Sequence, residues 1–494
     1  MAWKPLAGWF RKPAPKAYYD AARIKRRLAG WIPSTASARR LLETDGERMR
    51  ARVRDLVRNN SHAAAACECF VANLIGAGIK PSSKIADPSL RAAVQEAWLD
   101  WTDECDFDGL FDFYGLQAQI GRAVFEAGEC FVRFHERLEG DSKTVPLQLQ
   151  LLESDMLDMG FRQSLADDHE IFNGVEFDPD GRRVAYHFWV AHPGEMTVSD
   201  FSRAHGRERI RVPASEVLHI ANLKRPGQVR GVPIPAPSVV KLWLLDQYDD
   251  AELDRKKTAA MYAGFITSPA PEALVEDQDT EPDDGILTLE PGTMQVLKPG
   301  EEIAFSAPTE VGGSYEAFQY RNLLAAFSGM GIPYILGTGD VSRANYSSMR
   351  GEIVEFRRRL EQMQHNTIVF QLCRPVWQRW LDDGVLSGVL DIPNYAAERA
   401  VVSRAKWIPP KFDYVDPAKD VAAEADAVAA GFKSRSDVIE ASGEDPEEVD
   451  RRIAADKARE TALGLAFPKA ASHASPDPAA SDEGVESGAQ QQAD

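Results

Sequence analysis

The chain has 494 residues, 44% of them hydrophobic and 27% charged, a composition typical of globular proteins with a sizeable core. Its formal net charge of −19 argues against a protein that coats nucleic acid, because such proteins present a net basic surface. Five cysteines in so long a chain exclude a disulfide-built scaffold and favour a reducing compartment. No apolar run approaches the ~20 residues of a membrane span, and the Lys, Arg and Pro near the start argue against a signal peptide.

Charge is distributed unevenly along the chain. Residues 1–60 carry 15 Lys/Arg against 5 Asp/Glu, whereas residues 416–494 carry 8 against 18. Residues 270–302 carry ten acidic residues and a single Lys. Such asymmetry usually means that different surfaces meet different partners, although charged tails also serve solubility alone.

The first 36 residues are predicted to form an arm ahead of the folded body. Basic residues alternate there with prolines and aromatic residues, which are Pro5, Pro13, Pro15, Pro33, Trp3, Trp9, Phe10, Tyr18, Tyr19 and Trp31. Interleaved basic and aromatic side chains could bind nucleic acid or hold a neighbouring subunit. Extended arms more often tie neighbours together.

Residues 37–232 are predicted to form a mixed α+β body. Apolar residues at 3- and 4-residue spacing indicate helices, and apolar or alternating runs between turn residues indicate strands. The predicted helices cover residues 37–59, 63–75, a segment opened by Asp87-Pro88, and 110–128. The predicted strands cover residues 130–138, 147–152, 174–177, 184–190 and 217–220. The turn at residues 178–181, with sequence DPDG, joins the third and fourth strands into a hairpin.

From Ser238 onward the pattern is mainly helical. A stretch without Gly or Pro predicts a helix over residues 238–262, and its thin apolar content favours packing against copies of itself or bridging between domains. A small β-rich insert over residues 264–313 follows, and then a second helix from residue 314 to about residue 329. The strands expected in the insert cover residues 286–289, 294–297 and 303–305.

A polar loop over residues 337–346 precedes a third long helix, from residue 347 to about residue 381, in which Pro375 is the expected kink. Gly337 and Gly339 are expected to allow positive φ in the loop, and Asn345 or Ser347 to cap the helix after it. The chain ends in an acidic helical stretch and a tail, residues 416–465 and 466–494, and the composition of the tail predicts disorder.

Signals for catalysis are weak. Nine histidines are scattered without metal-ligand spacing, and neither a phosphate-binding P-loop nor a G-x-S-x-G elbow is present. Cys67-x-Cys69 lacks a second pair at zinc-finger spacing, so both cysteines are expected in a helix core. The acidic pairs 249–250 and 382–383 could hold a metal, but acids on helix surfaces are usually just solvated.

A series of short motifs occurs in a fixed order between about residues 50 and 450. They are DLVRNN (55–60), ANLIGAGIKP (72–81), PGQVRGVP (226–233), PGTMQVLKPGE (291–301), GIPY (331–334), GD (339–340), NYSSMR (345–350), WIPP (407–410) and VDPAK (415–419). Together with the order of the predicted parts, this series resembles the lambda-like family of portal proteins of tailed bacteriophages.

The resemblance implies an α+β, multi-part subunit that assembles into a ring. Its parts would be an N-terminal arm (1–36), a wing (37–232), a stem helix (233–262), a small β-rich clip (263–313), a second stem helix (314–336), a tunnel loop (337–346), a long kinked helix with the return of the wing (347–415), a helical crown (416–465) and a disordered acidic tail (466–494).

The resemblance also implies a ring, usually of twelve copies, at one capsid vertex, without catalysis, cofactor, metal or membrane. Double-stranded DNA would pass through its lumen during packaging by the terminase large subunit and again during ejection. The head-tail connector and the major capsid protein would contact the ring, which would assemble in the host cytoplasm and reside in the virion. An acidic lumen suits a conduit, because each neutralised phosphate adds affinity that would hinder sliding.

Candidate site residues follow from the same resemblance. In the stem they are Asp246, Asp250, Asp254 and Lys257. In the clip, as the docking surface for terminase and connector, they are Glu276, Asp277, Asp279, Asp283 and Asp284. In the tunnel loop they are Gly337, Thr338, Gly339, Asp340, Val341, Ser342, Arg343, Ala344, Asn345 and Tyr346. Two alternatives stay open: a metal-dependent nucleic-acid enzyme that uses clustered carboxylates, and a capsid or tail scaffold that does not contact DNA.

Overall fold

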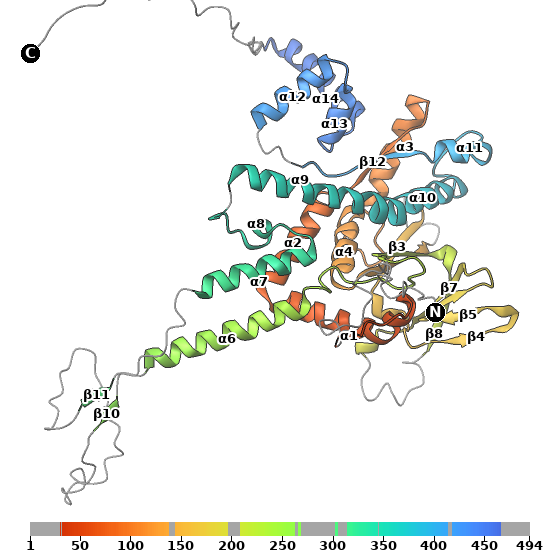
Figure 1. The fold of residues 1–494 in the computed structure, drawn as a ribbon. Helices are drawn as coiled ribbons and strands as arrows, with labels where there is room; N and C mark the ends of the chain where they lie inside the picture. Colours follow the sequence, from red (N-terminus) through yellow and green to blue (C-terminus); the bar gives the residue numbers. More distant parts are fainter. Residues whose placement is uncertain are drawn as a thin grey trace, which may run out of the picture. The chain divides into compact units, whose positions relative to one another are not determined.

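The computed structural model describes residues 30, 32–137, 144–195, 208–261, 265–267, 302–304, 314–343, 345–412 and 417–465. The chain divides between residues 415 and 416 into two compact units, here called unit 1 and unit 2. Unit 1 mixes helices with small sheets, whereas the described part of unit 2 is helical (Figure 1). The mixed α+β composition expected from the sequence is therefore confirmed. The N-terminal arm and the C-terminal tail lie almost wholly outside the described residues.

In the described part of the first half of unit 1 there are four α-helices, which confirm those predicted. A polar side chain caps each helix by accepting a hydrogen bond from a backbone N–H group of the first turn. These caps are Ser37, Asn60, Asp87 and Asp112. The helices are α1 (Ala38–Asn59), α2 (Ser61–Leu74), α3 (Pro88–Thr102) and α4 (Phe113–Glu126). After α2, Gly76 and Gly78 adopt positive φ and stop the helix, as expected.

Two antiparallel sheets follow these helices. The three-stranded sheet has the order β3-β2-β9, and the five-stranded sheet has the order β4-β5-β6-β7-β8. The first consists of β2 (Glu129–Glu136), β3 (Leu147–Leu152) and β9 (Val217–Ala221). The second consists of β4 (Gln163–Ser164), β5 (Glu170–Phe172), β6 (Val175–Phe177), β7 (Arg183–Trp189) and β8 (Arg209–Pro213). The predicted hairpin is the β6–β7 pair, while β4, β5 and β8 were not predicted because they are short or polar.

Long-range pairing closes unit 1. Lys80–Ser83 (β1) pairs antiparallel with Ala405–Ile408 (β12), with Lys80 opposite Ile408. The chain therefore returns to its own first helices after a detour of more than 300 residues.

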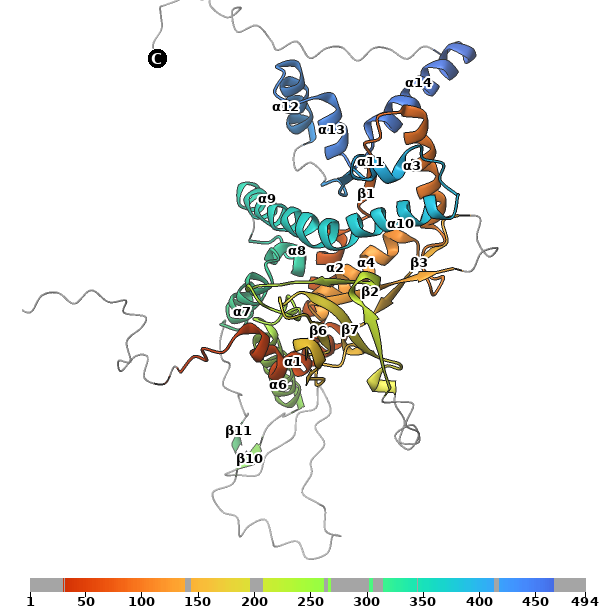
Figure 2. The same ribbon diagram turned by 90° about the vertical axis from the view of Figure 1, so that its right-hand side faces the viewer.

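The second half of unit 1 is mainly helical. Its helices are α6 (Val239–Met261), α7 (Ser314–Met330), α8 (Tyr334–Thr338), α9 (Tyr346–Met363), α10 (Arg374–Leu386) and α11 (Tyr395–Val402). Figures 1 and 2 show α9 and α10 along one side of α2 and α4. The Gln364 amide at the end of α9 donates a hydrogen bond to the carbonyl oxygen of Leu74 at 2.9 Å. No described helix is both long and apolar enough to cross a membrane.

The third long helix is irregular, as expected, but the irregular segment lies before Pro375 rather than at it. A π-helical segment, Gln364–Cys373, joins α9 to α10, and Pro375 occupies the first turn of α10. A proline cannot donate a hydrogen bond to the turn that precedes it, so the irregular hydrogen bonding falls on the N-terminal side of the ring.

A cluster of tryptophans forms the centre of the unit 1 core. Trp98 on α3 lies 4.8 Å from Trp101, 5.0 Å from Trp377 and 5.1 Å from Trp380, measured between ring centroids. All four side chains are buried. Since Trp377 and Trp380 belong to α10, the cluster fastens the C-terminal helices of unit 1 to its N-terminal ones.

Unit 2 consists of three helices in its described part. They are α12 (Pro417–Ala429), α13 (Arg435–Ala441) and α14 (Pro446–Leu463). Ser434 and Asp437 form a reciprocal capping box at the start of α13, and Asp445 caps α14. The helical character expected for residues 416–465 is therefore confirmed over the described residues.

Candidate functional site: the stem helices and the loop that follows

Helices α6 and α7 run antiparallel and pack closely where α6 begins. The Ser238 hydroxyl, just before α6, donates a hydrogen bond to the carbonyl oxygen of Ala326 at 2.7 Å. A Cβ atom on Gly329 would lie 2.4 Å from that hydroxyl, so only glycine allows this approach. Further along, the rings of Tyr248 and Tyr315 stack with centroids 6.0 Å apart. We call α6 and α7 together the stem pair.

Polar groups line the inner side of the stem pair. Asp249 on α6 accepts hydrogen bonds from the Tyr315 hydroxyl, at 3.1 Å, and from the Gln319 amide. Burial raises the pKa of Asp249, and burial lowers the pKa of the nearby His62 imidazole. Asp249 belongs to the acidic pair 249–250, one of the two pairs considered as possible metal ligands. In the structure its carboxylate instead accepts hydrogen bonds from two side chains of α7.

The four predicted stem residues lie along one side of α6, at spacings of four, four and three residues. Asp246, Asp250, Asp254 and Lys257 are all exposed. Asp246 accepts a hydrogen bond from the Asn60 amide at 3.2 Å, and Lys257 pairs with Asp254 at 3.4 Å. Asp246 therefore faces the junction of α1 and α2, and the expected place of all four in a channel wall stays a prediction.

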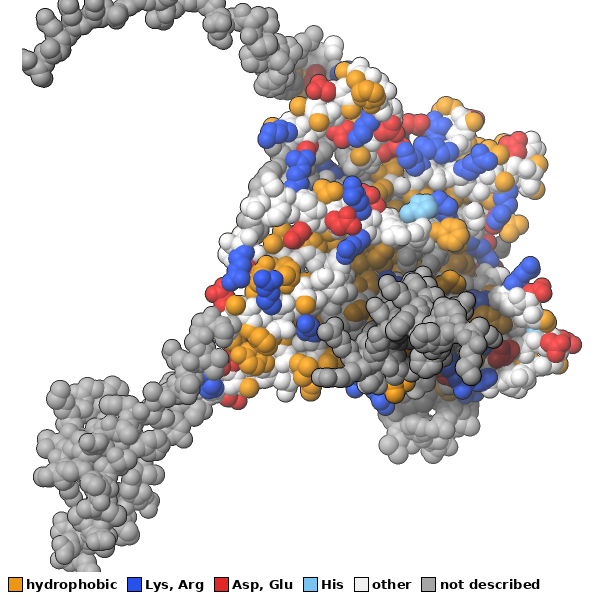
Figure 3. All heavy atoms as spheres, viewed as in Figure 1, with side chains coloured by type: hydrophobic (Ala, Val, Ile, Leu, Met, Phe, Trp, Pro, Cys, Tyr) orange, Lys and Arg blue, Asp and Glu red, His pale blue; other side chains and the backbone are white. Residues whose placement is uncertain are grey.

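The side of α6 opposite its buried residues carries an apolar stripe. Leu242 and Leu245 are buried, whereas Val240, Trp243 and Leu244 are 62%, 52% and 54% exposed. Figure 3 shows hydrophobic side chains at the surface over the stem pair. Large apolar side chains clustered on a surface mark a site of interaction with another molecule. We call these three residues the stem stripe.

The expected loop at residues 337–346 begins later than predicted. Residues 334–338 form the short helix α8, and the Thr338 hydroxyl donates a hydrogen bond to the carbonyl oxygen of Tyr334 at 2.8 Å. The expectation of positive φ at Gly337 is wrong, because this residue is buried inside α8. A Cβ atom there would lie 2.0 Å from the Phe327 ring, so Gly337 serves close packing. Only Gly339, with φ 72°, has the expected left-handed backbone.

The remaining loop is short and held by its own side chains. The Asp340 carboxylate accepts hydrogen bonds from the Ser342 N–H, at 2.9 Å, and from the Tyr334 hydroxyl, at 3.3 Å. The bond from Ser342 lowers the pKa of Asp340. Arg343 pairs with Glu316 on α7, and its guanidinium lies 4.5 Å from the centre of the Tyr320 ring.

The end of the loop is capped as expected. Asn345 accepts a hydrogen bond from the Ser348 N–H at 2.8 Å and so caps α9, while Val341 is exposed. Ala344 and the Tyr346 side chain lie outside what the structure describes.

The predicted clip lies almost wholly outside the described residues, and so do its five acidic site residues between 276 and 284 and the strands expected at 286–289 and 294–297. Its base is visible in two short strands. Phe265–Thr267 (β10) pairs antiparallel with Glu302–Ala304 (β11), so the chain enters and leaves the insert side by side. The strand predicted at residues 303–305 corresponds to β11.

A buried ion pair connects the three-stranded sheet to the segment that leads into α6. Glu129 on β2 and Arg230 are both fully buried, and the Arg230 Nε atom donates a hydrogen bond to the Glu129 carboxylate at 2.7 Å. The same carboxylate accepts hydrogen bonds from the Gly231 N–H, at 2.7 Å, and from the Ser154 hydroxyl, at 2.6 Å. It lies 2.8 Å from Nε2 of His219 on β9.

The surroundings fix the charge state of this pair. Burial alone would raise the pKa of Glu129, but Arg230 and His219 hold it well below its ordinary value. Burial lowers the pKa of His219, so the imidazole is neutral near pH 7. Sequence reasoning missed the pair, although Arg230 lies in the PGQVRGVP motif, where glycines flank a charged residue.

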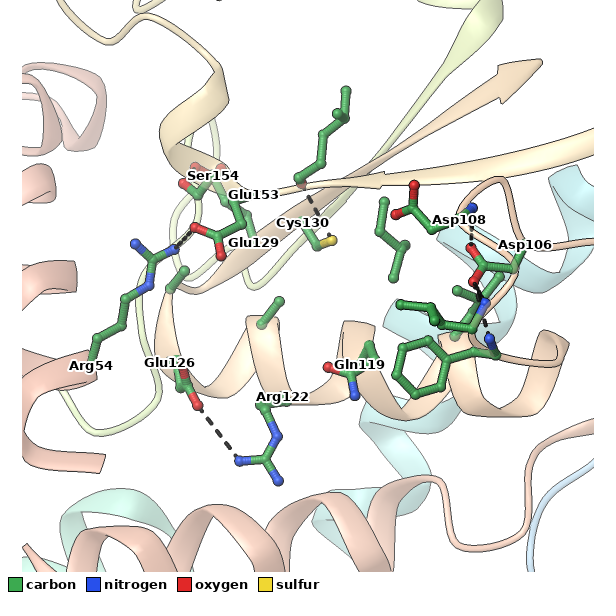
Figure 4. A pocket seen from close by; sticks show the side chains of 17 residues that line it. Arg54, Asp106, Asp108, Gln119, Arg122, Glu126, Glu129, Cys130, Glu153 and Ser154 are labelled. Carbon is green, nitrogen blue, oxygen red and sulfur yellow. Dashed lines mark hydrogen bonds and ion pairs between the residues drawn. The ribbon is translucent and has the colours of Figure 1, made fainter. Parts of the chain in front are cut away.

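A pocket of about 280 Å³ lies beside the pair, between α1, α4 and the β2–β3 strands (Figure 4). Glu153 at one side of the pocket could offer an oxygen ligand to a cation together with Asp155 and His192, since the ligand atoms of the three residues lie within 4.8 Å of one another. The Arg54 guanidinium already pairs with both carboxylates, which disfavours a cation there. At the other side, Asp106 accepts three backbone hydrogen bonds from its own loop.

Comparison with known proteins gives a consistent family. Residues 24–364 match the family model described as phage portal protein, lambda family. The chain is 26% identical over 481 residues to the probable portal protein of Halomonas phage phiHAP-1, covering 93% of this chain and 89% of that protein. It is 22% identical to the portal protein of Escherichia phage N15 and 21% identical to portal protein B of Escherichia phage lambda, covering 89% of each chain in both cases.

The fold also overlaps loosely with a chain from the virion of a native gene transfer agent particle. The TM-score is 0.44 at 15% identity, over 81% of this chain and 96% of that one.

The match to the family model extends from before α1 to the beginning of the π-helical segment, well over half of the sequence. The chain therefore belongs to the lambda family of phage portal proteins, which are structural components of the capsid and not enzymes.

Proposed function

We propose that this chain assembles into a ring, of about twelve copies as the family resemblance implies, that forms the DNA channel at one capsid vertex. The terminase large subunit would drive double-stranded DNA through the ring during packaging, and the DNA would leave by the same route at ejection. The head-tail connector and the major capsid protein would contact the ring from outside. The chain itself would supply no catalysis.

The stem stripe is the observation that carries the assembly part of this proposal. Val240, Trp243 and Leu244 leave apolar area in water on the side of α6 that its own body does not cover. Burying such area against a neighbouring stem pair stabilises association by about 25 cal/mol per Å² of apolar surface. A repeated contact of this kind between unlike surfaces closes into a ring when the rotation between copies permits it.

The charge of α6 agrees with a channel wall. Asp250, Asp254 and Lys257 lie on the exposed side of the helix, next to the stem stripe. A ring multiplies each charge by the number of copies, so a single exposed Asp per chain becomes a circle of negative charge. Such a wall repels phosphates and leaves DNA free to slide.

The loop at 339–345 and the clip complete the proposal. The loop presents Asp340, Val341 and Arg343 at its surface, held by hydrogen bonds within the loop and by the contacts of Arg343 with α7, which suits an element that faces DNA or fluid. The clip, with ten acidic residues against one Lys over residues 270–302, would form the docking surface for the terminase and then for the connector. In this proposal the wing, crown and tail would have the boundaries given by the resemblance, which are 37–232 with its return in 347–415, 416–465 and 466–494.

Assembly can be tested with two variants matched in exposure. We expect the purified chain to give a large homo-oligomer by light scattering and rings with an axial hole in negative-stain images. Trp243→Asp should abolish the rings, whereas Leu99→Asp, at an equally exposed apolar position on α3, should leave them intact. A stable monomer of the unaltered chain at physiological salt would refute the proposed architecture. Intact rings of Trp243→Asp would refute the role of the stem stripe.

A further inference from the structure

The helices of unit 2 are well formed, but none of their described side chains is fully buried. No side chain between residues 417 and 465 is buried, in contrast to unit 1. Apolar side chains stay in water: Val421 on α12 is 54% exposed, Phe432 is 87% exposed, and Leu463 on α14 is 66% exposed. Helices α13 and α14, by contrast, are capped by Ser434 and Asp445, and α14 ends at Gly464 in the left-handed conformation. The sequence thus specifies the helices without giving them a core.

Such a unit has little to stabilise it when alone. Ordering a chain costs conformational entropy, which the burial of apolar area normally offsets. Folded units of about this length usually need a disulfide, a bound metal or association with another chain even when they have a hydrophobic core. The ion pairs in the described part of unit 2 join exposed or half-exposed groups and therefore contribute little. They include Lys433–Glu424, Arg435–Asp450, Arg451–Glu448, Arg452–Glu444 and Arg459–Asp456. A stable unit 2 requires a surface from outside itself.

We infer that unit 2 becomes stably folded only when unit 2 of a second copy of the chain packs against it, so that its folding is coupled to ring assembly. The inference rests on the ring proposed above and adds to it a folding step that the ring makes possible. The partner of unit 2 is then unit 2 of another copy of the chain, and no other molecule.

The charges of unit 2 favour contact between unlike faces of two copies. Helix α12 carries Asp420, Glu424 and Asp426 against one Lys. The middle of α14, residues 451–459, carries four Arg/Lys against one Asp. Three of these basic residues already pair with acids of the same unit, so α14 of one copy against α12 of the next would extend existing ion pairs, whereas two acidic α12 helices side by side would repel. A contact between unlike faces repeats from copy to copy and can close a ring.

Phe432 is the best anchor for this contact. It lies in the turn between α12 and α13, and its backbone N–H donates to the carbonyl oxygen of Ala427 at 2.9 Å. Gly431 before it has φ 76°, so the turn has a defined shape that presents the ring outward. A large aromatic side chain held in a fixed and exposed position is typical of the residues that contribute most to an interface.

Hydrogen exchange of the full chain tests the inference. Rings of the unaltered chain would be compared with monomers of Trp243→Asp, whose substitution lies in unit 1. We expect the amides of residues 417–465 to exchange within about tenfold of the unstructured rate in monomers and at least about 100-fold more slowly in rings. The amides of α2 should be protected in both, which shows that unit 1 is folded.

A matched pair of variants adds a second readout. Phe432→Ser should leave the stability of unit 1 unchanged but raise exchange over residues 417–465 in rings by at least about tenfold. Leu386→Ser, at a comparably exposed position on α10 in unit 1, should not change exchange in unit 2.

The outcomes are distinguishable. Full protection of unit 2 in monomers would overturn the inference, because unit 2 would then find its partner surface within its own chain. Rings in which residues 417–465 exchange freely would also overturn it while leaving the channel proposal intact. Failure of the unaltered chain to form rings would refute the proposed function and this inference together.

Discussion

Replacing Glu129 by Gln should destabilise unit 1 severely, although the two side chains have nearly the same shape. The substitution leaves the Arg230 guanidinium fully buried without a counter-charge. It also turns one carboxylate oxygen into an NH₂ group, which cannot accept hydrogen bonds. Either the bonds from the Gly231 N–H and His219, which share Oε2, or those from Ser154 and Arg230, which share Oε1, are lost. Breaking a buried pair by removing one partner typically costs roughly 3–5 kcal/mol, because an uncompensated charge stays in the interior.

The magnitude follows from what the pair holds together. Four donors converge on one carboxylate within 2.6 to 2.8 Å, and they come from β9, from the turn after β3 and from the segment before α6. Bonds to a charged group are worth about 1.5–3 kcal/mol each, but they share one group and are not additive. A loss of about 4 kcal/mol, or about a thousandfold in the folding equilibrium, is therefore expected.

Urea unfolding followed by tryptophan fluorescence would measure the loss, since the cluster around Trp98 reports on unit 1. Arg58→Gln is the control, because Arg58 pairs with Asp55 at the surface at 3.8 Å and should cost less than ~0.5 kcal/mol. The double variant Glu129→Gln/Arg230→Met should recover part of the loss, since it removes the orphaned charge. If Glu129→Gln costs no more than Arg58→Gln, the reasoning about this buried pair is wrong.

Three further predictions concern pH, packing and thiols. Burial lowers the pKa of His62, His187 and His219 in the folded chain, so as pH falls these histidines take up protons in the unfolded chain before they do so in the folded one. The free energy of unfolding of unit 1 should therefore decrease as pH drops below about 6.5. Urea midpoints that do not change between pH 7 and pH 5 would contradict this. Gly337→Ala should cost about 1–3 kcal/mol in urea unfolding because its Cβ meets the Phe327 ring, and a neutral result would show that α8 can shift away. A thiol reagent should modify at most Cys69 in the folded chain and all five cysteines in denaturant, because the other four thiols are buried and have raised pKa values. Fast modification of more than one cysteine in the folded chain would contradict the burial of these four.

Helices and local turns could be predicted because their signals lie within a few residues. Asn60 ends α1 and caps α2, and Asp87-Pro88 opens α3, so caps and apolar spacing agree. The hairpin at β6 and β7 follows from DPDG, in which Gly181 adopts positive φ. Each of these helix ends and turns is determined by residues close together in the sequence, so it could be predicted without knowing the tertiary fold.

Features that depend on distant partners could not be predicted in this way. The Glu129–Arg230 pair joins residues 101 positions apart, and β1 and β12 are paired across most of unit 1. Gly337 looked like a loop residue, because nothing local reveals that Phe327 would fill the space of its Cβ atom. Within the candidate site, the acidic side of α6 was predicted, but the use of Asp246 to hold Asn60 was not, since it requires knowledge of what α6 packs against.

The position of the buried pair bears on how a channel subunit could work. Gly231 adjoins Arg230, and a Cβ atom there would lie 2.0 Å from the carbonyl oxygen of Gly128, so the two backbones touch at this point. Eight residues after Gly231 the stem helix α6 begins, already fixed to α7 through Ser238. The start of α6 is thus held to the sheet by a fully buried charge pair and by the close approach of two glycines. The loop after α8 is held by the exposed Arg343–Glu316 pair, by the contact of Arg343 with the Tyr320 ring and by a half-buried hydrogen bond from Tyr334 to Asp340. In the proposed channel, the more deeply buried contacts would therefore lie where the stem meets the body, and the less buried ones in the loop that would meet the DNA.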